Sequence, residues 1–143
     1  MFIFLISNLF AATGSTWKKP PQVLICDNSI SEQIINDSIK KWHEKKHSIE
    51  KKAERHTCEF ETSFYMQSRI MVSISKDMEE NTLGETTNYY YKDGRIAYSI
   101  IKISRNATNI QRVYEHEIGH ALGMKHSSMK EDVMFPTIAS SFY

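Results

Sequence analysis

Long hydrophobic runs, cysteines and an excess of charge of either sign are all scarce in this sequence. Its 143 residues allow one domain and are too few for two ordinary ones, while an apolar fraction of 41% is enough for a core. The formal net charge of +1 gives no reason to expect a nucleic acid or an acidic partner. Internal repeats are absent, which excludes a repeat architecture. Lysines gather between Lys40 and Lys52, but glutamates alternate with them, as is typical of a solvated helix face.

The apolar run from Met1 to Ala12 is too short for a membrane-spanning helix, which needs about 20 apolar residues. It fits the apolar part of a secretory signal peptide, and small residues follow it, although a basic segment ahead of it is lacking. We therefore predict a signal peptide over residues 1–14 and a single domain over residues 15–143, secreted to the extracellular space or the periplasm. A buried N-terminal strand and an uncleaved membrane anchor are the alternatives.

The two cysteines, Cys26 and Cys58, are too far apart for a CxxC redox motif. In an exported protein an isolated pair is more often a disulfide than a metal site. A bond between them would enclose about 31 residues and contribute roughly 3 to 4 kcal/mol in the chain-entropy model. In a reducing compartment both would instead be small buried apolar groups.

Hydrophobic periodicity predicts a first helix between short strands. Residues 23–26 form an expected buried strand, and Ile35, Ile39 and Trp42 then recur at helical spacing, which predicts an amphipathic helix over residues 31–55. His43 and His47 are four residues apart on this helix, but no third ligand is near, so we interpret them as surface histidines.

The second half of the chain predicts strands and one more helix. Strands are expected over residues 57–64, 69–75, 84–91 and 95–104, and Asp93-Gly94 marks a hairpin turn between the last two. A helix is expected over residues 109–124, capped by Thr108 or Asn109, with Ile118, Ala121 and Leu122 facing the core. Together these elements make an α+β or mixed α/β domain.

The most informative stretch begins at His116 and reads HEIGHALGMKH. His116 and His120 are four residues apart, so on a helix both rings lie on one face and reach one ion. Glu117 is placed to take a proton from a metal-activated water. Gly123 predicts the end of the helix through a left-handed conformation, after which the chain turns and brings back His126 as a third ligand. Three neutral imidazoles leave the fourth zinc position open, as in catalytic sites.

This HExxHxxGxxH pattern resembles the zinc signature of the metzincins. Met134, eight residues after His126 in the segment VMFP, resembles the Met-turn that lies beneath the zinc in that family. The pair Ser127-Ser128 and the VMFP segment are most similar to the matrixins, the matrix metalloprotease branch. Pro136 stands where astacins and serralysins have a tyrosine that can ligate zinc, which disfavours those branches.

The resemblance implies a metzincin-like zincin fold, with a twisted mixed β-sheet, an N-terminal backing helix and an active-site helix. It implies one catalytic Zn²⁺ on the three histidines, with Met134 as the floor of the site. The strand over residues 84–91 would pair with an extended peptide. The wall of the pocket for the residue after the scissile bond would consist of Pro136, Thr137 and Ile138.

Three departures from matrixins are also expected. Some ten residues separate the predicted signal from Val23, too few for a propeptide, and no cysteine lies there to act as a latency switch. Residues 66–104 contain no histidine and only the aspartates Asp77 and Asp93, so structural zinc and calcium sites are not expected. The seven residues after Pro136 are too few for the helix that usually closes the domain.

We therefore predict a zinc-dependent endopeptidase that hydrolyses extended protein substrates, with Glu117 as the general base. A polypeptide is the expected partner and a nucleic acid is not, while a membrane is expected only if the N-terminal segment is retained. The alternative is a catalytically silent metzincin-fold binding module. The intact Glu117 argues against that alternative, because a binding module has no need of this carboxylate.

Overall fold

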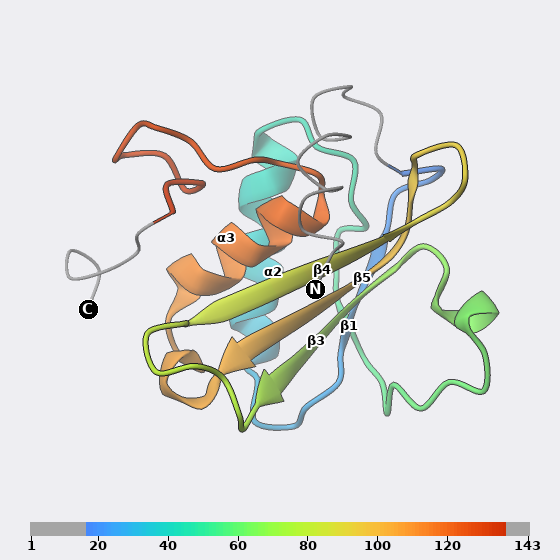
Figure 1. Cartoon of the computed structure of the whole chain (residues 1–143), viewed down its shortest axis with the longest axis horizontal. Coiled ribbons are helices and arrows are strands. Elements are labelled where there is room, and N and C mark those ends of the chain that lie inside the picture. The colour runs from blue at the N-terminus through green and yellow to red at the C-terminus, as the bar shows by residue number, and fades with distance from the viewer. Residues whose placement is uncertain (1–16, 137–143) are drawn as a thin grey trace.

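The computed structural model describes residues 17–136, which form one five-stranded sheet with helices packed against it (Figure 1). The elements in chain order are β1 (Gln22–Ile25), α2 (Glu32–Glu44), β2 (Glu54–Arg55), η2 (Ser63–Met66), β3 (Arg69–Ser75), β4 (Gly84–Tyr90), β5 (Ile96–Ser104), η3 (Arg105–Ala107) and α3 (Gln111–Ala121). The predicted α+β class is confirmed.

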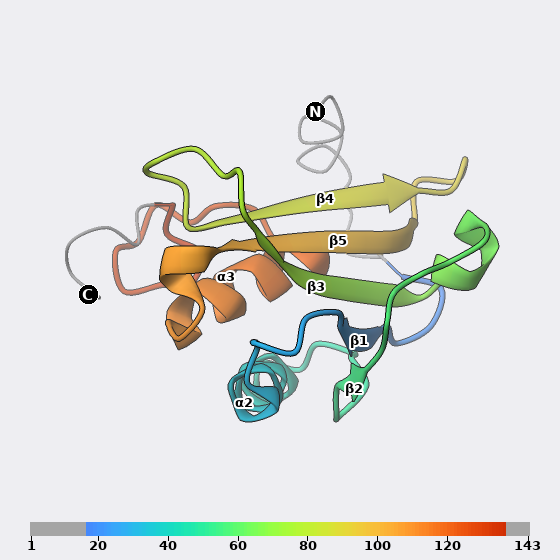
Figure 2. The ribbon, with the colours of Figure 1, turned by 90° about the horizontal axis from the view of Figure 1, so that it is seen from below.

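The sheet is mixed and has the strand order β2-β1-β3-β5-β4. The first four of these strands pair in parallel, whereas β4 pairs antiparallel with β5 through the hairpin. The turn of that hairpin contains Gly94 at φ 88°, so the turn predicted from Asp93-Gly94 is confirmed. The order leaves β4 at an edge, with no described strand on its other side (Figure 2).

Both α-helices bury their apolar sides in one core with the sheet. The predicted inward residues of α2 are at most 2% exposed: Ile35, Ile39 and Trp42. Those of α3 are at most 5% exposed: Ile118, Ala121 and Leu122. The sheet contributes alternate residues of its central strands to the same core: Val23, Ile25, Ile70, Val72, Ile101 and Ile103.

The first helix is much shorter than predicted. It begins as expected, after the capping residue Ser31, but it ends at Glu44 rather than at Arg55. Lys46 adopts a left-handed conformation at φ 70°, and its N–H donates to the carbonyl of His43 over 2.9 Å. The next N–H, of His47, donates to the carbonyl of Trp42 over 3.0 Å, which completes a Schellman ending.

The sequence concealed this ending because a lysine occupies the position that usually holds glycine. The edge of the His47 ring contacts Trp42 at 5.1 Å between centroids, in place of the apolar contact that often accompanies this motif. Ile49 falls on the same helical period, but it belongs to the loop that follows α2 and is buried there.

Other boundaries also differ from the predictions. The strand predicted over residues 57–64 is wrong, because this stretch is a loop that leads into η2, and the strand lies earlier as the two-residue β2. The first strand is displaced by one residue, to Gln22–Ile25, whereas β3 has its predicted bounds. Within residues 17–136 no helix has the length and apolarity needed to cross a bilayer. The predicted signal peptide lies outside the described residues.

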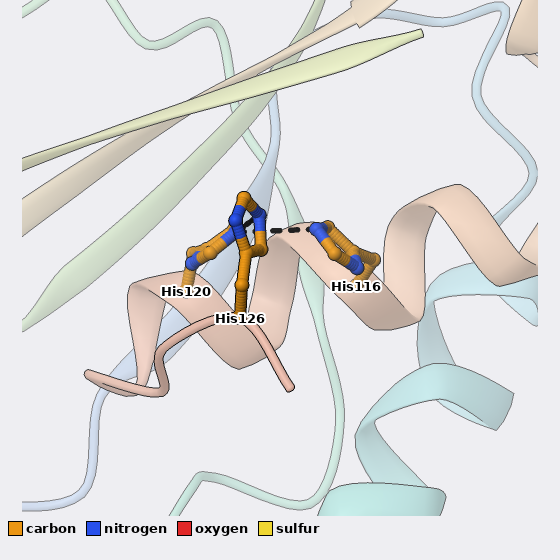
Figure 3. Close-up of side chains that lie close together, drawn as sticks. All are labelled: His116, His120 and His126. Atoms are coloured by element: carbon orange, nitrogen blue, oxygen red, sulfur yellow. Dashed lines mark hydrogen bonds between the residues drawn. The ribbon is translucent and has the colours of Figure 1, made fainter. Parts of the chain in front are cut away.

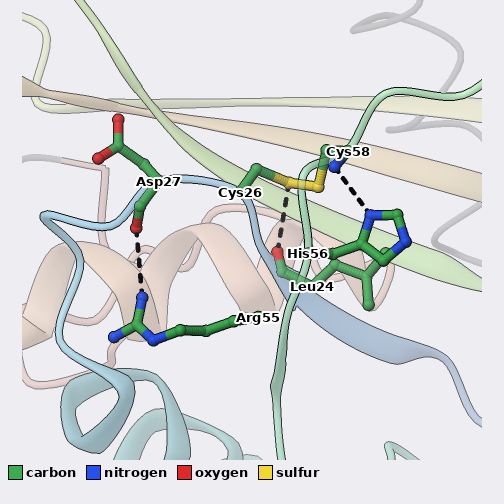
Figure 4. The surroundings of a disulfide bond; sticks show 6 residues. All are labelled: Leu24, Cys26, Asp27, Arg55, His56 and Cys58. Carbon is green, nitrogen blue, oxygen red and sulfur yellow. Dashed lines mark hydrogen bonds between the residues drawn. A yellow bond between two sulfur atoms is a disulfide. The ribbon is translucent and has the colours of Figure 1, made fainter.

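A disulfide joins Cys26, directly after β1, to Cys58, in the loop after β2, with 5.5 Å between the two Cα atoms (Figure 4). Cys58 has a left-handed backbone at φ 58°, and its N–H donates to Nδ1 of His56 over 2.8 Å. Since β2 pairs with β1 over only two residues, the covalent bond fastens a short edge strand that the ladder alone holds weakly.

We expect the double variant Cys26→Ala/Cys58→Ala to unfold with a free energy about 3 kcal/mol lower than that of the unaltered chain, because the 32-residue separation gives a large loop-closure entropy. Urea unfolding of the metal-free proteins measures the difference. Equal midpoints for the two chains would contradict a stabilising disulfide.

Candidate metal centre

The helix α3 carries the first part of the HExxH pattern and ends where Gly123 predicted. Gly123 has φ 94°, its N–H donates to the carbonyl of His120 over 2.9 Å, and the N–H of Met124 donates to that of Gly119 over 2.9 Å. This is again a Schellman ending, and it reverses the chain so that His126 returns towards the helix. The predicted cap is wrong: α3 follows Ile110, whose side chain makes no capping hydrogen bond.

The three predicted ligands converge on one point (Figure 3). Nε2 of His120 lies 3.1 Å from Nε2 of His116 and 3.0 Å from Nε2 of His126. In the described part of the chain these three histidines form the one group whose ligand atoms could hold a metal ion. His43 and His47 take no part in such a group.

Backbone carbonyls determine which nitrogen of each helix histidine faces the centre. Nδ1 of His116 lies 2.7 Å from the carbonyl oxygen of Val133, and Nδ1 of His120 lies 2.9 Å from that of Met124. A carbonyl only accepts, so both Nδ1 atoms carry the proton and both Nε2 atoms present lone pairs. Metal-ligating histidines typically have this kind of support.

Lone pairs that face one another across about 3 Å repel, and a cation between them removes the conflict. Zinc bonded to nitrogen at about 2.0–2.1 Å in tetrahedral geometry separates two ligand nitrogens by about 3.3 Å. The separations of 3.0 and 3.1 Å are close to that value. The donor set and the two separations from His120 therefore fit a zinc ion.

The electrostatic environment keeps these imidazoles neutral, as metal ligands must be. Burial lowers the pKa of His116 and that of His126. Burial, together with the two neighbouring imidazoles, lowers the pKa of His120 to about 3. All three rings are therefore neutral at neutral pH.

Glu117 is 5% exposed, and its side chain extends from α3 towards β4. The hydroxyl of Thr86 donates to Oε2 of this carboxylate and lies 3.1 Å from the carbonyl oxygen of Glu117. Burial raises the pKa of Glu117 to about 7, although the hydrogen bond from Thr86 opposes the shift. A Cβ atom at Gly84 would lie only 3.0 Å from Oε1, so glycine leaves room for the second carboxylate oxygen.

A second polar residue of β4 also supports α3. Nδ2 of Asn88 donates to the carbonyl of His120 over 2.9 Å, and the hydroxyl of Ser99 on β5 donates to Oδ1 of Asn88. Thr86 and Asn88 are both buried, and their spacing of two residues puts them on the same face of the strand. Sequence reasoning missed both, because the alternating burial of β4 appears only in the structure.

Met134, which the resemblance places at the floor of the site, packs against the helix α3. It is 2% exposed, and its sulfur packs against Gly119, which lies one residue before His120. A Cβ atom at Gly119 would also lie 2.5 Å from Cζ2 of Trp42. Only glycine allows both contacts, and this requirement was not predicted. The amide of Ser127 donates to the carbonyl of Met134 over 2.9 Å and closes the loop.

The substrate-pocket prediction is not tested. Pro136 is exposed at the end of the described residues, and Thr137 and Ile138 lie beyond them. On β4, Tyr89 stacks on Tyr98 of β5 with 4.4 Å between ring centroids, as an ordinary cross-strand pair does.

Comparison with known proteins agrees with this geometry. The sequence profile of the matrixins matches residues 16–142. The chain belongs to the matrixin family. Matrixins generally use zinc, and the three histidines of this matrixin could hold such an ion. A segment of 34 residues is 50% identical to metalloendoproteinase 2-MMP of Arabidopsis thaliana, and it covers 24% of this matrixin chain and 9% of the plant protein.

We expect Thr86→Val to lower the free energy of unfolding by about 1–3 kcal/mol, because it leaves the buried Glu117 carboxylate without its hydroxyl donor. Thr87→Val is the matched control, since Thr87 lies on the opposite face of the same strand. Urea unfolding of all three chains measures the effect. Equal losses in the two variants would show that the Thr86 hydroxyl contributes nothing specific.

Proposed function

We propose that this matrixin is a zinc endopeptidase that cleaves extended polypeptides. The observation that carries the proposal is the convergence of three imidazoles, since Nε2 of His120 lies 3.1 Å from that of His116 and 3.0 Å from that of His126. The three ligand atoms all lie within 4.8 Å of one another. A zinc ion held there supplies Lewis-acid chemistry, which polarises a peptide carbonyl and makes water acidic.

Glu117 provides the proton transfer. A carboxylate with a pKa near 7 can accept a proton from the attacking water and later return it to the amine that leaves. Thr86 holds Oε2, so Oε1 below Gly84 is the oxygen left to exchange the proton. The carboxylate thus has one fixed oxygen and one working oxygen.

The edge strand β4 provides the substrate surface. Its main-chain groups on the outer side pair with no other described strand, so an extended peptide can add there by β-augmentation. Because Thr86 and Asn88 bind α3 at Glu117 and His120, a peptide on this edge lies alongside the proposed catalytic residues. This arrangement supports a polypeptide substrate.

Glu117→Ala is expected to retain about one zinc per chain and to lose peptide cleavage by a factor of about 10² or more, since general-base catalysis alone contributes that much. His120→Ala is the partner variant and is expected to lose both zinc and cleavage, because it removes a ligand. Elemental analysis and a quenched-fluorescence peptide library, with and without a chelator, measure both properties. A Glu117→Ala chain that cleaves peptides at the original rate would refute the mechanism.

We also propose that the protein is exported. The disulfide supports an oxidising compartment, and the apolar run at residues 1–12 supports a cleaved signal. Mass spectrometry of the protein from its own cells is expected to give a mature N-terminus near Ser15. A chain that still begins at Met1 would favour a retained anchor instead.

A further inference from the structure

The segment before β1, η2 and the β4–β5 turn lie at the same end of the sheet (Figures 1 and 2). Side chains from these segments line a cavity of about 570 Å³ that lies away from the histidines. None of the residues that line it belongs to the proposed metal centre. They are Lys18, Lys19, Phe64, Tyr65, Gln67, Ser68, Arg69, Tyr91 and Arg95. The cavity therefore needs an explanation of its own.

Four of these lining residues are cationic and none is acidic. Asp93 binds the guanidinium of Arg95 over 2.6 Å. No ion pair in the described part of the chain involves the other three, which are Lys18, Lys19 and Arg69. The formal net charge of the whole chain is only +1, so the positive charge at this cavity is a local concentration.

Aromatic rings lie beside these charges and are accessible. Phe64 is 69% exposed and Tyr65 is 55% exposed, and their rings contact each other edge to face with 5.7 Å between centroids. Nζ of Lys18 lies 4.8 Å above the ring centre of Tyr91. Large exposed rings next to a group of cations that outnumber the one nearby carboxylate, Asp93, are unusual on a surface that serves only for solvation.

We propose that this cavity binds an acidic polysaccharide. Arginine and lysine side chains pair with carboxylate or sulfate groups, and flat rings stack against the C–H faces of pyranose sugars. Cations and aromatic rings also suit single-stranded nucleic acid. The disulfide favours the sugar polymer, because structural disulfides persist outside the cytosol, where acidic glycans are the abundant polyanions.

The cavity then anchors the chain to a glycan matrix, and this role does not depend on zinc or on catalysis. Such an anchor would concentrate the protein where extracellular proteins are embedded. Binding can therefore be measured separately from peptide cleavage, so failure of one proposal leaves the other intact.

The test titrates the full-length mature chain with four labelled oligomers: a heparin oligosaccharide, an oligogalacturonate, a neutral malto-oligosaccharide and oligothymidylate. Fluorescence anisotropy gives the Kd values. We expect the acidic glycans to bind, the neutral one not to bind, and affinity to fall as salt rises. Lys18→Glu/Lys19→Glu is expected to weaken acidic-glycan binding about tenfold or more.

Lys51→Glu/Lys52→Glu is the matched control, because it reverses two adjacent exposed lysines outside the cavity and changes the net charge equally. We expect it to change Kd by less than about twofold. Phe64→Ala/Tyr65→Ala keeps the charge and is expected to weaken glycan binding as well. Circular dichroism and thermal midpoints confirm that each variant folds.

Three results would overturn the proposal. Equal weakening by the two lysine pairs would mean that net charge alone drives binding. Oligothymidylate that binds as tightly as the acidic glycans would assign the cavity to nucleic acid. Unchanged glycan affinity of the Phe64→Ala/Tyr65→Ala chain would show that the aromatic rings do not recognise sugar.

Discussion

Three imidazole lone pairs held close together are the constraint on which the rest of the structure depends. Such an arrangement is unfavourable without a cation, so the fold must impose it. The carbonyls of Val133 and Met124 do so for the two helix histidines by fixing their tautomers. His126, which is exposed, arrives from the loop that Gly123 makes possible.

The strand β4 and the helix α2 hold α3 in place from opposite sides. On one side Thr86 and Asn88 bind the helix at Glu117 and at His120, which are the residues that need fixed positions. On the other side Trp42 donates to the carbonyl of Glu115 over 2.8 Å and packs against Gly119. The helix is thus fixed by polar contacts to β4 and by a close steric fit to α2.

The sequence predicted the ligand set well because its information is local. A four-residue helical period, one glycine that ends the helix and one methionine are enough to bring His116, His120 and His126 together. The pairing of β4 with β5 was also predictable, because Asp93-Gly94 is a turn sequence that favours a hairpin.

The features that the sequence did not predict are of two kinds. Some depend on a residue in a backbone conformation that its type rarely adopts, and others depend on contacts between segments that are distant in the chain. Lys46 ends α2 in a conformation that usually signals glycine, so periodicity alone extended that helix as far as Arg55. The roles of Thr86 and Gly84 exist only because α3 packs on β4, some thirty residues away in the chain. No local pattern carries such information.

The free edge of β4 has a further consequence, for solubility. An open strand edge attracts the edges of other molecules as readily as it attracts a peptide. The register of β4 against β5 shifts between Tyr89 and Tyr90, and such bulges increase the local twist of a strand. The shift lies at the last pair, so Gly84 to Tyr89 keep one register and the added twist is confined to the end of the edge beside the turn. The regular part suits the capture of an extended segment, whereas the twisted end hinders the sideways growth of sheets between copies.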